Sequence, residues 1–183
     1  LALTGPRVRR LMRTYDARLE LDAKVYAKAR RAMTRALERE GAMTRAQLAT
    51  VFEKAGIPAS GQRLAHLMMD AELDALVCSG PKRGAQMTYV LVDAHVRPVE
   101  TVSRDDALAL LAARYFRGHA PATLHDFAWW SGLTLGDARR GVEAVSAGDL
   151  LLASPPTMDR VAGAHFLLPN YDEYFIAYRH RDA

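Results

Sequence analysis

The sequence lacks most of the features that mark metalloproteins, membrane proteins and the common enzyme classes. Its one cysteine, Cys78, excludes an internal disulfide framework and fits a reducing cytoplasm. No apolar run approaches the roughly 20 residues that cross a bilayer, and no signal-peptide pattern is present. Cysteine and histidine spacings typical of zinc sites, glycine-rich phosphate loops and the glycine-flanked serine elbow of hydrolases are also missing. We therefore expect a cytoplasmic protein with no metal, no cofactor and no membrane contact.

Charge is the most uneven property of the chain. Its 183 residues are 50% hydrophobic and 25% charged, which suits one large or two small globular domains. Residues 1–40 hold 11 Lys and Arg against 5 Asp and Glu, although the whole chain has a net charge of only +4. A concentrated cationic segment attracts polyanions better than a basic average does, so a nucleic-acid partner is favoured. A solvated helix face is the alternative.

A basic β-hairpin is predicted over residues 76–92. Two apolar runs flank the turn Gly80-Pro81-Lys82-Arg83-Gly84, and glycine with proline typically closes such turns. The second run alternates, with Met87, Tyr89 and Leu91 on one face and Gln86 and Thr88 on the other. Lys82 and Arg83 would stand at the tip, where a packed core gains nothing from them.

Two helices joined by a turn are predicted before the hairpin. Thr44 with Gln47 forms a capping-box pattern at the start of the first, residues 45–55, and Ser60 is expected to cap the second, residues 61–74. In a helix-turn-helix, the second helix enters the major groove with its N-terminal residues. The groove-facing candidates are therefore Gln62, Arg63 and His66. The acidic end of this helix, Asp70, Glu72 and Asp74, would have to point away from phosphates.

The first 40 residues predict two basic helices. Gly5-Pro6 should break or restart the first, and Asp22 should cap the second, residues 23–40, which carries Arg31 and Arg35 opposite its apolar stripe. The segment 93–103 has few apolar side chains that could enter a core, and it is interpreted as a linker.

The pattern then repeats. Three helices are predicted over residues 104–116, 124–130 and 135–146, with Ser103, Thr123 and Thr134 as caps. Apolar pieces near 150–152 and 164–168 suggest a second, longer wing, and Arg139 and Arg140 would match the groove-facing residues of the first repeat.

Of the adjacent Trp129 and Trp130, one should be more exposed, because neighbours on a helix cannot share a face. The fold class is mainly α with small β-hairpins (α+β), as tandem winged helices.

Three phrases resemble the AlkZ-like winged-helix family, bacterial proteins whose best-understood members are DNA glycosylases for alkylated and crosslinked bases. They are GPKRGxQxTYxL at 80–91, ARYxxGHxPATxxDFAWWSGL at 113–133 and LLPxYDEYxxxYR at 167–179. The resemblance implies that residues 1–20 are a remnant of a preceding winged helix, 21–95 and 103–168 are two winged helices, and 169–183 begin a C-terminal segment.

The catalytic Gln-x-Gln motif of the family does not occur here, since Gln47, Gln62 and Gln86 are each isolated. The chain does not begin with Met, and we expect the catalytic part to precede it, so no catalytic residue is expected in this sequence.

The expected function is double-stranded DNA binding by a monomer, as part of a repair glycosylase. A non-catalytic transcriptional regulator and a protein-interaction scaffold are the alternatives. The predicted DNA-binding residues are Lys82, Arg83, Gln86, Gln62, Arg63, His66, Arg139, Arg140, Arg31 and Arg35.

Overall fold

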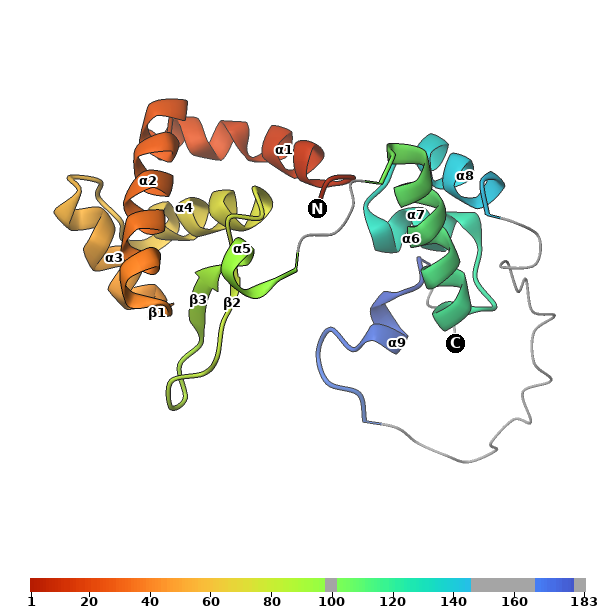
Figure 1. Ribbon diagram of the computed structural model, residues 1–183. Coiled ribbons are helices and arrows are strands. Elements are labelled where there is room, and N and C mark those ends of the chain that lie inside the picture. Colours follow the sequence, from red (N-terminus) through yellow and green to blue (C-terminus); the bar gives the residue numbers. More distant parts are fainter. Residues whose placement is uncertain (98–101, 146–166, 180–183) are drawn as a thin grey trace. The chain divides into compact units, whose positions relative to one another are not determined.

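The computed structural model describes residues 1–97, 102–145 and 167–179, and the chain divides into two compact units, Leu1–Glu100 and Thr101–Ala183. Both are mainly helical, and the first also contains a small antiparallel sheet (Figure 1). The predicted class, mainly α with a small β component, is therefore confirmed. The predicted second wing, between residues 150 and 168, falls almost entirely outside the described residues.

The first unit contains most of the described helices and all of the described strands. Its elements are α1 (Gly5–Arg18), α2 (Ala23–Glu40), β1 (Met43–Thr44), α3 (Arg45–Lys54), α4 (Gly61–Leu73), β2 (Val77–Ser79), β3 (Thr88–Leu91) and α5 (Val92–His95). The short helix α5 corrects the prediction that a linker begins at residue 93. It begins directly at the end of β3, where Val96 N donates to Val92 O.

Local signals fix most helix starts in this unit. Pro6 stands in the first turn of α1, so Gly5-Pro6 begins the helix as predicted. Asp22 accepts from Val25 N (2.8 Å) at the start of α2, and Thr44 and Gln47 form the predicted capping box of α3. Ser60 precedes α4 but makes no capping hydrogen bond, so that prediction was wrong.

The sheet has the order β1-β3-β2, with both pairs antiparallel. The core beneath it gathers apolar side chains from α2, α3, α4 and β2, including Met33, Leu48, Phe52 and Leu67. The alternation predicted for β3 is confirmed within the strand, where Thr88 and Val90 are each only 1% exposed and Tyr89 and Leu91 are partly buried against the core, whereas Met87 before the strand is exposed. Thr88 is tolerated there because its hydroxyl donates to Pro81 O (2.5 Å).

The second unit contains α6 (Arg104–His119), α7 (Leu124–Ser131), α8 (Leu135–Glu143) and the short α9 (Glu173–Ile176). Ser103, Thr123 and Thr134 all cap their helices as predicted. Helices α6 and α8 cross so closely that a Cβ on Gly141 would lie 2.8 Å from Leu108 O. The core is aromatic: Tyr115 packs against Phe127 with ring centroids 5.2 Å apart.

Candidate nucleic-acid interface

The hairpin between β2 and β3, residues 80–87, projects from the first unit and is referred to below as the wing (Figure 1). At its base, a Cβ on Gly80 would lie 2.6 Å from Val90 and 2.8 Å from the Thr88 hydroxyl, so only glycine fits. Near its tip, Arg83 N donates to Gln86 O (2.9 Å) and Gln86 N donates back to Arg83 O (3.2 Å). These two bonds close the loop at its tip.

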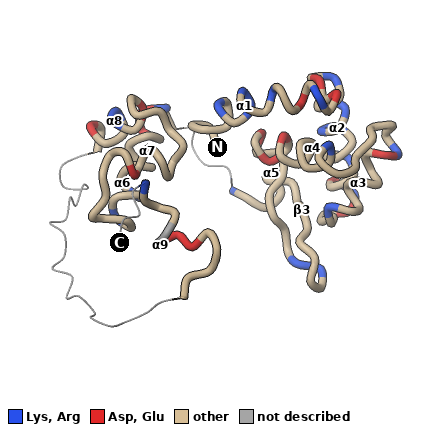
Figure 2. Tube along the Cα trace, turned by 180° about the vertical axis from the view of Figure 1, so that it is seen from behind, with Lys and Arg blue, Asp and Glu red and all other residues tan. Residues whose placement is uncertain are grey.

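The wing tip is cationic, as Figure 2 shows. Lys82, Arg83 and Gln86 are all exposed. The Arg83 guanidinium donates to Ala42 O (3.1 Å) and to Gln47 Oε1 (3.3 Å), so it is tied to the start of α3. Gln47 was predicted only as a cap, and its second role of fixing Arg83 has no local signal, because the two residues lie 36 positions apart.

A groove of about 560 Å³ lies beside the wing. It is lined by Thr44, Arg45, Ala46, Leu64, Gln86, Met87 and Tyr89. The exposed Arg45 therefore adds a cation in the same groove as Gln86 and Met87 of the wing, one that sequence reasoning did not select. On α2, the predicted Arg31 and Arg35 are exposed and line a separate groove of about 370 Å³.

The three groove-facing candidates of α4 have different surroundings. Gln62 is exposed. Arg63 donates to Pro58 O (2.9 Å) and also to Leu19 O. The His66 side chain is 13% exposed, and its Nδ1 lies 2.7 Å from Asp16 Oδ1. Arg63 and His66 therefore use their polar groups in contacts within the protein, with residues at or near the C-terminal end of α1.

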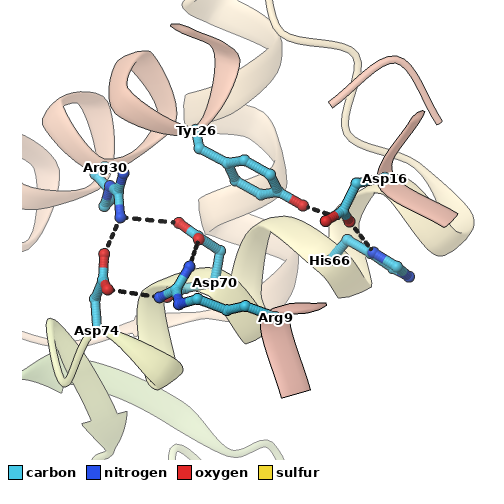
Figure 3. Close-up of polar contacts among 7 residues, drawn as sticks. All are labelled: Arg9, Asp16, Tyr26, Arg30, His66, Asp70 and Asp74. Carbon is cyan, nitrogen blue, oxygen red and sulfur yellow. Dashed lines mark hydrogen bonds and ion pairs between the residues drawn. The ribbon is translucent and has the colours of Figure 1, made fainter. Parts of the chain in front are cut away.

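Helix α1 is attached to α4 by a polar network that Figure 3 draws. Arg9 pairs with Asp70 and, at 2.5 Å, with Asp74. Arg30 of α2 pairs with Asp74 and lies 3.4 Å from Asp70 Oδ2, an oxygen that no hydrogen bond reaches among the described residues. Two of the three acidic residues at the end of α4, Asp70 and Asp74, are therefore paired with arginines inside the unit.

A second part of the same network centres on Asp16. Its carboxylate accepts from Tyr26 Oη (2.7 Å) and faces His66. Burial raises the pKa of the Tyr26 phenol far above its ordinary value, and the hydrogen bond to Asp16 raises it further. Sequence spacing could have indicated this face, because Arg9, Met12 and Asp16 recur at three and four residues along α1.

In the second unit, the two predicted arginines of α8 differ. Both are exposed, but Arg140 pairs with Asp105 of α6 at 2.6 Å, while no hydrogen bond or ion pair of Arg139 is found in the described part of the chain. Trp129 is 55% exposed, whereas Trp130 Nε1 donates to Glu173 Oε1 (2.5 Å), so the predicted difference between the two is confirmed.

Among residues 1–97, 102–145 and 167–179, no group of three His, Cys, Asp or Glu residues could hold a metal ion. None of the helices in the same ranges is long and apolar enough to span a membrane.

Comparison with known proteins gives a match along the whole chain. The family described as DNA glycosylase AlkZ-like matches residues 1–183. No curated protein and no solved structure matches the chain.

Proposed function

The chain belongs to the AlkZ-like DNA glycosylase family, and from this we propose that it is a duplex-DNA-binding part of a base-excision repair protein. The observation that carries the proposal is the wing: two exposed cations, Lys82 and Arg83, stand at the tip of a hairpin that backbone hydrogen bonds close. Phosphates attract such groups in any sequence, and preorganised groups lose less entropy on binding.

The order of elements in the first unit supports its assignment as a winged helix. Helices α2, α3 and α4 would be its three helices, β1, β3 and β2 its sheet, and residues 80–87 its wing. In the second unit, α6, α7 and α8 would be the corresponding helices of a second winged helix. Capping boxes at Thr44 and Thr123 start the second helix of each proposed winged helix and support the repeat.

The proposed phosphate contacts are the exposed cations. They are Lys82 and Arg83 on the wing, Arg45 beside it, Arg31 and Arg35 on α2, and Arg139 and Arg140 on α8. Gln86 and Gln62 are the proposed polar contacts near the grooves. Arg63 and His66, which the sequence placed in the same set, are left out because they are only partly exposed and have polar groups bonded within the unit, whereas Arg83 and Arg140 keep exposed side chains despite their bonds.

The chain should bind DNA without excising a base. Base excision requires that the damaged nucleotide be flipped into a pocket whose side chains act on its glycosidic bond. The Gln-x-Gln motif to which the family resemblance assigns this chemistry is absent, and Gln47, whose amide oxygen accepts from Thr44 N (2.8 Å), serves as a helix cap.

A protein-interaction scaffold is less well supported. Its main argument was the acidic end of α4, and Asp70 and Asp74 are both paired with arginines rather than available to a basic partner.

A salt titration tests the proposal. The affinity of the chain for a short undamaged duplex would be measured by fluorescence anisotropy from low to moderate salt. Each neutralised phosphate contributes about 0.9 to the slope of log affinity against log salt, so two wing contacts alone give a slope near −2. A slope close to zero would contradict phosphate contact. Appearance of abasic sites in an alkylated duplex would contradict the absence of catalysis.

A further inference from the structure

The outward face of α4 is already covered. In a helix-turn-helix this face enters the major groove. Here Asp70 and Asp74 pair with Arg9 of α1, and His66 contacts Asp16 of α1 (Figure 3). Arg63 donates to Leu19 O just beyond α1. Four of the six polar side chains that the sequence analysis singled out on α4 therefore contact α1 or the residue just after it. Gln62 and Glu72 are the other two.

The contact between α1 and α4 also has an apolar part. Met12 of α1 and Met69 and Leu73 of α4 line one cavity of about 190 Å³, beside the ion pairs of Arg9. Gly5 at the start of α1 is buried, and a Cβ there would lie 3.8 Å from Leu73 O. Removing α1 would break the pairs of Arg9, Asp16 and Arg63 together and would expose this apolar surface.

The exposed surface of α1 carries cations. Arg10 and Arg18 point away from the face of Arg9, whereas Arg13 follows Arg9 by one turn and flanks that face. All three are exposed, and none of their side chains makes a hydrogen bond or ion pair that is seen within the described ranges. Figures 1 and 2 agree that α1 and the wing tip lie on opposite sides of α4. The first unit therefore presents two separate cationic surfaces with a covered helix between them.

We infer that α1 stays on α4 when DNA binds, and that α1 contacts phosphates in place of base reading by α4. The unit would then hold duplex DNA of any sequence, which suits a protein that must find lesions in every sequence context. The inference rests on the proposed DNA binding, but it is a separate claim about which surface is used.

A reversible lock tests it in the whole chain. Met12→Cys and Met69→Cys, in a Cys78→Ala background, would join α1 to α4 when oxidised, with bond formation checked by mass spectrometry. If the pair fails to form, Leu73→Cys replaces Met69→Cys, because both side chains line the same cavity. Affinity for two duplexes of unrelated sequence would be measured with the lock oxidised and reduced.

We expect oxidised and reduced protein to bind both duplexes with affinities within roughly twofold, because sequence-independent phosphate contact does not require α4. Loss of about tenfold in the oxidised form, restored by reduction, would mean that α4 must be uncovered and would overturn the inference. Preference of the reduced form for one duplex would overturn it as well. Absence of binding in both forms would instead defeat the proposed function itself.

A charge variant tests the role of α1 directly. Arg10→Ala with Arg13→Ala should reduce the salt slope by about 2, with the wing unchanged. An unaltered slope would show that the outer side of α1 does not touch DNA.

Discussion

Arg9 of α1 forms an ion pair with Asp70 of α4, which lies 61 positions later in the chain. The Asp70 side chain is only 6% exposed, so its charge depends on the partners that it finds inside the protein. Arg9 supplies the direct pair, and Arg30 supplies a second, longer one. This ion pair holds α1 on α4, and it makes the acidic end of α4 compatible with the DNA binding proposed for the unit.

Arg9→Ala should therefore destabilise the first unit. Breaking a buried pair commonly costs about 3–5 kcal/mol, and because Arg30 remains beside Asp70 we expect about 1–3 kcal/mol. The exposed neighbour Arg10→Ala is the matched control and should stay within about 0.5 kcal/mol. Both tryptophans lie in the second unit, so circular dichroism during urea unfolding should shift while tryptophan fluorescence should not. Equal effects of the two variants would contradict the role of the pair.

Two glycines of the second unit should respond in opposite directions to the same substitution. A Cβ on Gly141 would lie 2.8 Å from Leu108 O, a backbone atom, so Gly141→Ala should separate α6 from α8 and cost about 1–3 kcal/mol. Gly118, within α6, has open space around it, and Gly118→Ala should stabilise by about 0.5–1 kcal/mol. Tryptophan fluorescence during unfolding checks both, and a stable Gly141→Ala protein would show that the helices do not cross this closely.

Alkaline pH should weaken both units through one tyrosine in each. Burial raises the pKa of Tyr26 and of Tyr115 far above the ordinary value, helped by Asp16 and by Asp126 respectively. Above about pH 10 the unfolded chain loses these phenol protons while the folded chain keeps them, so the free energy of unfolding falls as pH rises. Below about pH 10 the two phenols are protonated in both states and contribute no pH dependence.

Tyrosinate absorbance measures this directly. Of the seven tyrosines, Tyr26 and Tyr115 should ionise only as the folded signal is lost. Tyr26→Phe should make the alkaline loss of the first unit less steep and leave the second unit unchanged, and Tyr115→Phe should do the reverse. Ionisation of all seven near pH 10 in folded protein would contradict the burial of both phenols.

The features that could be predicted from the sequence are those controlled by residues close together in the chain, namely helix starts and the hairpin. The capping residues Asp22, Thr44, Ser103, Thr123 and Thr134 placed helix starts correctly because each bonds within its own first turn. The basic hairpin was predicted equally well, since Gly80-Pro81 and the apolar runs are adjacent in sequence. Ser60 shows the limit of this reasoning, because a residue suited to capping need not form the bond.

Long-range contacts were not predictable in this way. Alternation placed Thr88 on the polar face of β3, but its bond to Pro81 O lets it stand inside. Periodicity marked one face of α1 and one face of α4 without showing that Arg9 meets Asp70. For that reason Arg63 and His66 were predicted to read a groove, while their observed partners are Leu19 O and Asp16.

The two wing cations should contribute differently to DNA binding. Lys82→Ala should lower the salt slope by about 1 and leave stability unchanged, because no bond holds its side chain in the described part of the chain. Arg83→Ala also removes the bonds to Gln47 and Ala42 O, so it should add a stability cost of about 1 kcal/mol. Lys54→Ala with Arg97→Ala, two exposed cations away from the wing, controls for net charge.

Thr88→Val separates wing geometry from wing charge. It keeps every cation but removes the bond to Pro81 O, so the wing should be held less firmly at its base. We expect weaker binding with an unchanged salt slope, because the number of phosphate contacts stays the same while the entropy lost on binding increases. Anisotropy titrations at several salt concentrations measure both quantities. An unchanged affinity would mean that Lys82 and Arg83 act as charges alone, without help from the rigid hairpin that carries them.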